Sequence, residues 1–294
     1  MKKLTIFTPT YNRAHLLNVA YKSLIAQKEF KNDFIWLIVD DGSSDNTKEV
    51  VKKFIDEGLI EIKYHHKANG GKYTAMNSAF DLIETEYSMC LDSDDFILEN
   101  GLGLLFETLN NDNRENIGFV FPRTLNAHKY DLNSIDNRLL NISDIKLKYG
   151  FSIETAIVFR TRDIKEYRFV ENEERFASEE ILYNMMIESG KFLFKNHEIV
   201  GGEYLEEGLT NNIYKLWFKN YKNTMKLFLS RYKYVDNNVK GVRQCIEKLK
   251  CIINISSICM KKGVSIFEKS PNKFLTIVTY IPAIWYKKSR YNFD

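Results

Sequence analysis

The sequence contains few prolines, glycines and cysteines, the residues that interrupt helices and strands or form cross-links. This scarcity excludes several classes of protein. Its 294 residues include only four Pro and 14 Gly, which is too few for a fibrous or low-complexity protein. The four cysteines contain no pair with CxxC spacing, so we expect reduced thiols in a cytoplasmic protein rather than a disulfide scaffold. With 44% hydrophobic and 28% charged residues, the chain can bury a large core and is not disordered.

Long apolar segments are also missing. The first residues, Met1 to Phe7, hold two lysines and a short apolar run that ends before Pro9, so they predict no signal peptide. The longest mostly apolar stretch, Phe274 to Tyr286, is shorter than the roughly 20 residues that a membrane-spanning helix needs. Lysine, arginine and Trp285 stand at its edges. This pattern fits a helix lying in a membrane interface, and it fits equally a helix that packs on the rest of the protein.

Positive charge is concentrated in one part of the chain. The net charge is +3, yet residues 212–294 carry 17 Lys and Arg against 4 Asp and Glu, whereas the preceding part carries 25 against 35. A basic end on an acidic body predicts an anionic partner, which can be a membrane surface or a nucleic acid. Aromatic residues such as Trp217 and Tyr221 lie among these lysines and could stack on bases.

Hydrophobic periodicity divides the chain into alternating strands and helices over its first half. There the predicted strands are 4–8, 34–39, 60–65 and 87–91, and the predicted helices are 13–27, 46–57 and 71–84. After residue 101 the pattern is looser and predicts further strands at 117–121 and 155–159 and a helix at 179–189. Strand–helix alternation with short connections predicts an α/β fold with a parallel, doubly wound sheet. From residue 212 onward the pattern is mainly helical.

Polar clusters follow three of the predicted strands: Thr8-Pro9-Thr10, Asp40-Asp41 and Asp92-Ser93-Asp94-Asp95. Ligands of doubly wound sheets bind at the carboxyl ends of the strands, so we expect the three clusters to meet at one edge. Three carboxylates within four residues repel one another unless a cation lies among them. Mg²⁺ and Mn²⁺ prefer oxygen ligands and often bind both a protein carboxylate and a phosphate, so this cluster predicts a divalent-cation site.

Four motifs in this order resemble those of a family 2 glycosyltransferase of the GT-A fold. They are Thr8-Pro9-Thr10-Tyr11-Asn12-Arg13, Val39 to Asp45, Asn69-Gly70-Gly71-Lys72 with Ala75-x-Asn77, and Asp92-x-Asp94-Asp95. Phe176 to Glu179, Tyr183-Asn184 and Glu203 to Thr210 resemble a bacterial branch associated with surface polysaccharides. The resemblance implies a Rossmann-like, doubly wound mixed sheet in residues 1–211. Residues 212–294 would form a basic, mainly helical region.

The resemblance also implies an inverting transfer from a nucleotide-diphosphate sugar, with uracil as the base that best suits an aspartate partner. It assigns nucleotide-sugar contacts to Pro9, Thr10, Tyr11, Arg13, Asp41, Lys72, Asp92 and Ser93, and the Mn²⁺ or Mg²⁺ ion to Asp94 with support from Asp95. Within this set Tyr11 would pack on the base and Lys72 would contact the diphosphate.

Transfer to a hydroxyl requires a group that removes its proton. The resemblance places this group in the acidic pair Glu179-Glu180, where many relatives have Glu-Asp. Successive helix residues point about 100° apart, so the two carboxylates cannot face an acceptor equally. The adjacent Tyr183-Asn184 sets the register in favour of Glu179.

Two other functions are weighed against the transferase. A sugar nucleotidyltransferase would have a glycine-rich loop after the first strand, where this chain has Thr8-Pro9-Thr10-Tyr11. A non-catalytic nucleotide-sugar-binding module would need no base. The expected partners are a nucleotide-sugar donor and a carbohydrate or lipid-linked acceptor. For the basic end we favour the anionic inner face of the cell membrane over a nucleic acid.

Overall fold

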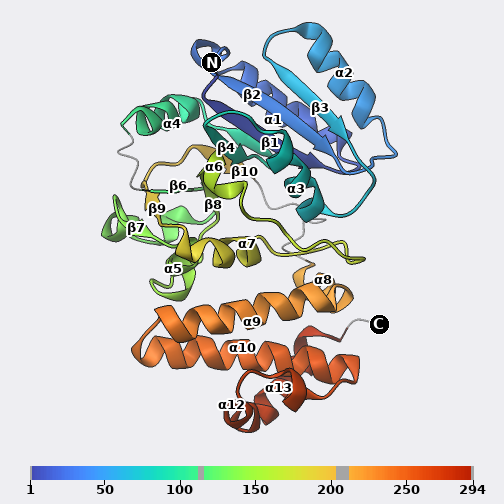
Figure 1. Ribbon diagram of the computed structural model, residues 1–294, viewed down its shortest axis with the longest axis vertical. Helices are drawn as coiled ribbons and strands as arrows, with labels where there is room; N and C mark the ends of the chain where they lie inside the picture. Colours follow the sequence, from blue (N-terminus) through green and yellow to red (C-terminus); the bar gives the residue numbers. More distant parts are fainter. Residues whose placement is uncertain (1, 112–115, 203–211, 293–294) are drawn as a thin grey trace.

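The computed structural model describes residues 2–111, 116–202 and 212–292. A central sheet with flanking helices forms one part of the molecule, and a tier of helices lies at its other end (Figure 1). The large sheet has eight strands in the order β3-β2-β1-β4-β8-β6-β9-β7, and β10 pairs with β5 in a small second sheet. The strands are β1 Leu4–Thr10, β2 Phe34–Asp40, β3 Ile62–His66, β4 Tyr87–Cys90, β5 Asp95–Ile97, β6 Gly118–Pro122, β7 Leu139–Leu140, β8 Thr155–Arg160, β9 Phe192–Phe194 and β10 Val200–Gly202. The predicted α/β class is confirmed.

The sheet is parallel in its first half and mixed in its second. Strands β3, β2, β1 and β4 are parallel neighbours, as strand–helix alternation predicts. Strand β8 then pairs antiparallel with both β4 and β6. Short-range alternation alone predicted only the parallel part, whereas the resemblance implied the mixed sheet that the structure contains.

Both faces of the sheet are covered by apolar side chains. Successive residues of a strand point to opposite faces, and in β2 Trp36 and Ile38 enter one core while Leu37 and Val39 enter the other. A strand covered on both faces therefore needs a continuous apolar run. This explains why Phe34 to Val39 lacks the polar alternation of a half-exposed strand.

Helices cover each face in turn along the chain. Apolar residues of α1, α2 and α4 belong to the first core, and those of α3, α5 and α7 belong to the second. The bounds are α1 Ala14–Ile25, α2 Thr47–Glu57, α3 Lys72–Leu82, α4 Gly101–Asn110, α5 Ile142–Leu147, α6 Thr161–Ile164 and α7 Glu180–Met185. The helix predicted to reach Ser189 ends earlier, because a 3₁₀ turn at Met186–Glu188 follows α7.

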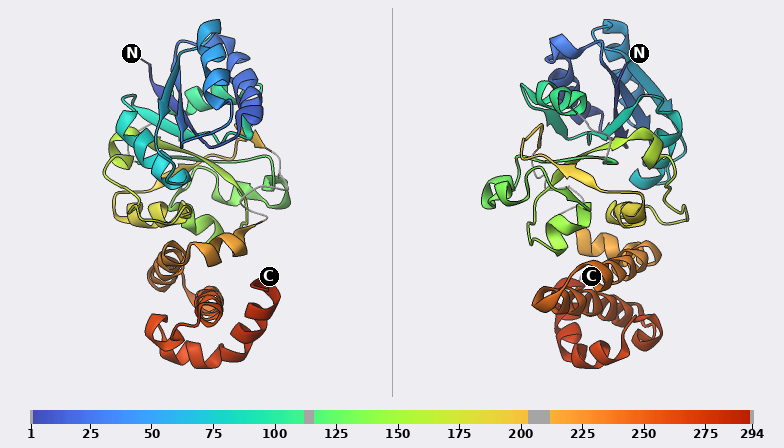
Figure 2. Two further views of the ribbon diagram at one scale, coloured as in Figure 1. Left: turned by 90° about the vertical axis from the view of Figure 1, so that its right-hand side faces the viewer. Right: turned by 60° about the vertical axis from the view of Figure 1, so that its left-hand side comes forward.

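The helices after residue 212 form the second tier, visible in the views of Figure 2. They are α8 Ile213–Lys219, α9 Tyr221–Asn238, α10 Gly241–Lys262, α11 Ile266–Lys269, α12 Lys273–Val278 and α13 Tyr280–Arg290. Phe228 of α9, Ile255 and Ile258 of α10 and Tyr291 share one buried cluster. None of the helices in the described ranges combines the length and the apolar character that crossing a membrane requires.

Candidate active site

The strand ends bring the predicted polar clusters into one cavity. Thr10 lies opposite Asp40 across β1 and β2, and Phe7 lies opposite Cys90 across β1 and β4, so the loops that follow share one edge. The cavity there has a volume of about 740 Å³. Its lining includes Pro9, Thr10, Tyr11, Arg13, Asp41, Lys72, Asp92, Ser93, Asp94, Asp95 and Glu179. Of the predicted site residues only Glu180 is absent from this lining.

Asn12 joins the loop after β1 to the loop after β2. Its side-chain oxygen accepts a hydrogen bond from the backbone N–H of Ser44 at 2.7 Å, and its own backbone N–H donates to the Ser43 hydroxyl at 2.9 Å. The backbone of Asn12 has a φ of 51°, a conformation that asparagine tolerates better than most residues. The turn leaves the neighbouring Tyr11 exposed at the cavity.

Asp41 anchors the glycine-rich loop that leads into α3. Its buried carboxylate accepts hydrogen bonds from the N–H groups of Gly70 and Gly71, at 2.9 and 2.6 Å, and from the Lys67 amine at 2.9 Å. Gly71 has a φ of +95°, and a Cβ there would lie 2.0 Å from the carbonyl oxygen of Arg175, so only glycine fits. The anchor fixes where α3 begins, and Lys72 is its first residue. A contact between Asp41 and a uracil base stays a prediction.

Each carboxylate of the acidic cluster is paired with a cation from a different element. Asp92 lies 2.8 Å from the Lys72 amine, and Asp94 lies 3.2 Å from the Arg13 guanidinium. Asp95 is bonded to Arg123. The positive charges of Lys72, Arg13 and Arg123 therefore offset the repulsion among the three carboxylates. Each of them holds one carboxylate at the cavity wall.

Arg123 was not among the predicted site residues. It directly follows β6, so its place after a strand end could have indicated it. Its pairing with Asp95 depends on β8 lying between β4 and β6, which periodicity does not predict.

The pocket environment changes the ionisation of these groups. Desolvation alone would lower the pKa of Lys72, but the carboxylates of Asp92 and Glu179 raise it well above its usual value. Burial tends to raise the pKa of Asp92, and the adjacent Lys72 holds it below its usual value. Burial and the charge of Asp92 raise the pKa of Asp95 to about 7 although Arg123 opposes the shift. Lys72 and Asp92 are therefore an ionised pair at neutral pH.

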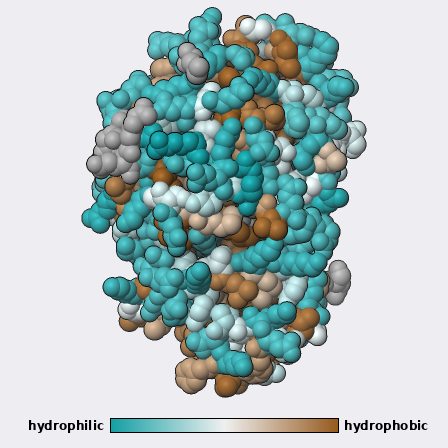
Figure 3. All heavy atoms as spheres, viewed as in Figure 1, coloured by the Kyte–Doolittle hydropathy of each residue, from teal (hydrophilic) through white to brown (hydrophobic). Residues whose placement is uncertain are grey.

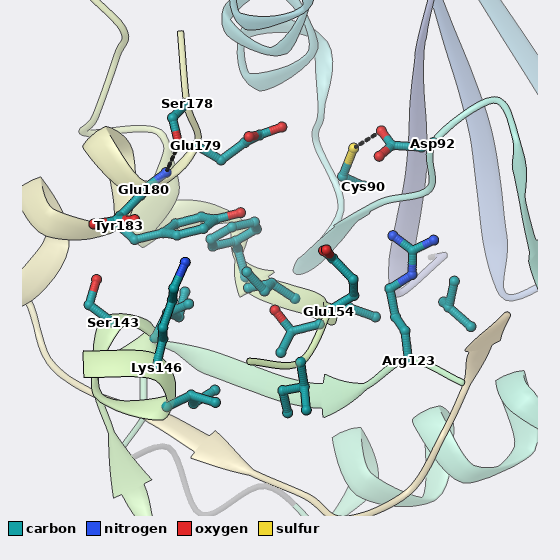
Figure 4. Close-up of a pocket in the computed structure, with 18 of the residues that line it drawn as sticks. Cys90, Asp92, Arg123, Ser143, Lys146, Glu154, Ser178, Glu179, Glu180 and Tyr183 are labelled. Carbon is teal, nitrogen blue, oxygen red and sulfur yellow. Dashed lines mark hydrogen bonds between the residues drawn. The ribbon is translucent and has the colours of Figure 1, made fainter. Parts of the chain in front are cut away.

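Glu179 and Glu180 point in different directions. The Glu179 carboxylate lies 2.8 Å from the Lys72 amine, and Figure 4 shows it extending toward Asp92. Glu180 points away from it and receives two hydrogen bonds from the Arg231 guanidinium of α9, one of them 2.6 Å long. Glu179 thus lines the larger cavity. Glu180 does not line it; its carboxylate is held in a largely buried ion pair with Arg231, beside the smaller cavity described next.

A second cavity of about 320 Å³ adjoins the first. The two cavities share a charged wall made of Lys72, Asp92, Asp95, Arg123, Glu154, Ser178 and Glu179. The smaller cavity continues between α5 and α7, where Lys146 points toward Tyr183 (Figure 4). Two ligands, one in each cavity, would meet at Glu179.

Residues after position 212 complete the site. Ile213, Leu216 and Asn220 line the larger cavity. The side-chain oxygen of Asn220 accepts hydrogen bonds from the N–H groups of Arg175 and Phe176, at 2.9 and 3.1 Å. Glu174 in turn accepts from the N–H groups at the start of α9. The segment that carries Glu179 is therefore held by the helical tier. The predicted motif from Glu203 to Thr210 lies outside the described residues.

The acidic cluster fits a divalent cation only in part. Among the residues that the structure describes, no three His, Cys, Asp or Glu side chains are grouped so that they could hold a metal ion. Asp94 remains partly exposed at the larger cavity, with 22% of its side chain accessible. An oxygen-preferring cation that takes one protein carboxylate and completes its coordination with phosphate oxygens is compatible with this arrangement.

Comparison with known proteins identifies the family. The sequence model of "Glycosyl transferase family 2" matches residues 5–168. The chain is 26% identical to the Campylobacter jejuni GalNAc(5)-diNAcBac-PP-undecaprenol beta-1,3-glucosyltransferase, over 96% of this chain and 94% of that one.

Solved structures share the fold of this chain. Staphylococcus aureus TarS residues 1–349, in complex with UDP-GlcNAc, superpose with a TM-score of 0.59 at 16% identity, over 98% of this chain and 89% of that one. A Pyrobaculum calidifontis mannosyltransferase in complex with GDP-Man and Mn²⁺ gives 0.58 at 14% identity, over 98% and 87%. The chain has the GT-A fold and belongs to glycosyl transferase family 2.

Proposed function

We propose that this glycosyltransferase moves a sugar from a UDP-sugar to an acceptor hydroxyl, with inversion at the anomeric carbon. The product would be a bacterial cell-surface polysaccharide or glycoconjugate, formed on the cytoplasmic side of the membrane. The names of the similar proteins support this choice, since one transfers glucose to an undecaprenol-linked glycan and another binds UDP-GlcNAc. The observation that carries the proposal is the position of Glu179 on the wall between two adjoining cavities.

The larger cavity suits the donor. The exposed ring of Tyr11 offers a surface on which a base can pack, and Lys72 supplies a positive charge for a diphosphate. Asp94, with Asp95 beside it, would hold Mn²⁺ or Mg²⁺ together with that diphosphate. When bound, such an ion would neutralise the charge that develops on the leaving UDP.

The smaller cavity suits the acceptor. A hydroxyl placed there beside Glu179 can give its proton to the carboxylate while its oxygen attacks the anomeric carbon from the side opposite the leaving group. Lys72 contacts both Glu179 and Asp92 at 2.8 Å. A donor diphosphate would compete for this amine, which would free the Glu179 carboxylate to accept the proton.

The first experiment identifies the reaction. The full chain is incubated with a panel of UDP-, GDP- and dTDP-sugars and Mn²⁺, and the released nucleotide is measured. We expect slow release of UDP from one UDP-sugar by hydrolysis, and faster release once an acceptor is supplied.

Other outcomes point to the alternatives. Pyrophosphate formed from UTP and a sugar phosphate would indicate a nucleotidyltransferase. A thermal shift with UDP-sugars but no turnover with any acceptor would indicate a binding module. Either result would overturn the proposal.

A further inference from the structure

The apolar stretch near the C-terminus is arranged with its small residues inward. Residues Thr276, Thr279 and Ala283 of this segment have between 0% and 3% of their surface exposed. The Ser257 hydroxyl of α10 donates a hydrogen bond of 2.9 Å to the carbonyl oxygen of Ala283. Small side chains therefore bring α12 and α13 close to α10. Leu275 and Tyr286 also pack inward, but five larger apolar residues of the segment are left on the opposite side.

Those larger residues form one outward stripe. Phe274, Ile277 and Val278 of α12 and Ile281 and Trp285 of α13 are between 55% and 78% exposed. The spacing i, i+3, i+4 in α12 and i, i+4 in α13 places the residues of each helix on one face of that helix. A helix of a soluble protein turns such a face to the core. The stripe lies on the tier farthest from the sheet (Figure 1), where brown apolar residues reach the surface at the lower end in Figure 3.

The stripe differs from the other exposed apolar residues of the described chain. Outside it, Val170 at 68% and Val242 at 77% are the large apolar residues with more than 60% exposure in residues 2–111, 116–202 and 212–292. They lie on separate elements, and isolated exposed residues of this kind need no explanation. Five exposed apolar residues that are close together in the sequence do need an explanation.

Basic residues surround the stripe. Between Lys261 and Asn292 the chain has seven Lys and Arg and a single acidic residue, Glu268. Lys273 precedes the stripe, and Lys287, Lys288 and Arg290 follow it, with Lys288 on the same helical face as Trp285. An apolar centre with a positive border and an interfacial tryptophan complements the headgroup region of an anionic bilayer. A second copy of the chain would bring these positive borders together, which disfavours self-association.

We propose that α12 and α13 form a membrane-docking surface whose stripe inserts among the headgroups of an anionic lipid bilayer. The basic residues then lie at the level of the lipid phosphates. This surface is separate from the two cavities, so it supplies attachment and takes no part in transfer. The sequence left open whether the segment from Phe274 to Tyr286 lies in a membrane interface or packs on the rest of the protein. In this proposal it does both, because one side of the segment packs on α10 and the other is exposed.

The test uses the full chain and vesicles of phosphatidylcholine, with or without one third phosphatidylglycerol. Wild type should sediment with the anionic vesicles, bind the neutral ones more weakly, and be partly released by high salt. Replacing Ile281→Ser and Trp285→Ser together should weaken the binding at least about 10-fold, since two large side chains lose their burial in lipid. The matched control, Val170→Ser with Val242→Ser, should bind like wild type.

A second pair of variants separates charge from apolar contact. Lys287→Gln with Lys288→Gln should reduce binding to anionic vesicles and leave the weak binding to neutral ones unchanged. The control pair, Lys28→Gln with Lys31→Gln, removes two exposed lysines far from the stripe and should change neither. Every variant should keep the thermal unfolding temperature and the UDP release of wild type, so failure of docking is distinct from failure of the transferase proposal.

Two results would overturn the docking surface. One is equal sedimentation of wild type and the Ile281→Ser, Trp285→Ser variant with anionic vesicles. The other is that light scattering shows wild type as a dimer and the Ile281→Ser, Trp285→Ser variant as a monomer, while wild type does not bind vesicles. The stripe would then be a protein interface.

Discussion

Replacing Glu179 and Glu180 separately by glutamine should separate catalysis from stability. Glutamine keeps the size of glutamate but cannot accept the acceptor proton. At Glu179 we expect kcat to fall roughly 10²- to 10⁴-fold, the usual contribution of a general base, which corresponds to about 2.7–5.5 kcal/mol of activation free energy. The fold should be unaffected, because Lys72 keeps Asp92 as a partner at 2.8 Å.

The same change at Glu180 should act on stability. Its carboxylate and Arg231 are 18% and 14% exposed, and removing one partner of such a pair leaves a largely buried charge uncompensated. This costs about 3–5 kcal/mol, or a fall of roughly 6–20 °C in unfolding temperature. When the assay is run at a temperature at which the variant is still folded, kcat should fall less than about 10-fold.

The double variant Glu180→Gln, Arg231→Met supplies the control. It removes both charges, so most of the lost stability should return, because replacing a buried ion pair by uncharged side chains is often neutral. The assays are steady-state UDP release with saturating donor and acceptor, and thermal unfolding of each variant. A large loss of kcat in Glu180→Gln combined with a nearly normal kcat in Glu179→Gln would refute the assignment.

Three further changes test other parts of the site. Asp94→Ala should abolish transfer without unfolding the chain, and EDTA should do the same to wild type reversibly; full activity of the variant in chelator would remove the metal role. Asp41→Asn can accept only one of the two glycine N–H bonds, so unfolding experiments should show a loss of about 1–3 kcal/mol; unchanged stability would contradict the anchoring role. Gly71→Ala would clash with the Arg175 carbonyl at 2.0 Å and should lower both stability and donor affinity by calorimetry; wild-type values would show that this approach is not required.

The first half of the fold could be predicted because its signals are local. Strands β1, β2 and β4 are apolar runs, each followed by a polar cluster, and parallel strands place those ends at one edge. The second half could not, because β8 enters the sheet beside β4 through a pairing between Tyr87 and Arg160, which are far apart in sequence. Register over such a separation depends on tertiary packing rather than on periodicity.

The site shows the same division between local and distant information. The predicted site residues other than Glu180 line the larger cavity together, and the divergence of Glu179 from Glu180 follows from helix geometry. Their partners come from elsewhere, since Arg123 lies after β6 and Arg231 lies on α9. A motif can indicate that a carboxylate is present, but the cation that fixes its direction depends on which distant segment packs beside it.

The helical tier connects the two proposals. On one side α9 contributes Arg231 as the partner of Glu180 in α7, and Asn220 just before α9 holds the loop that leads into α7. On its other side α9 packs on α10, against which α12 and α13 lie. Residues 212–292 therefore line part of the larger cavity as well as carrying the exposed stripe. If the stripe rests in a bilayer, the packing of α9 on α10 sets how far Glu179 stands above the lipid surface, and an acceptor carried by a lipid would have to reach that height.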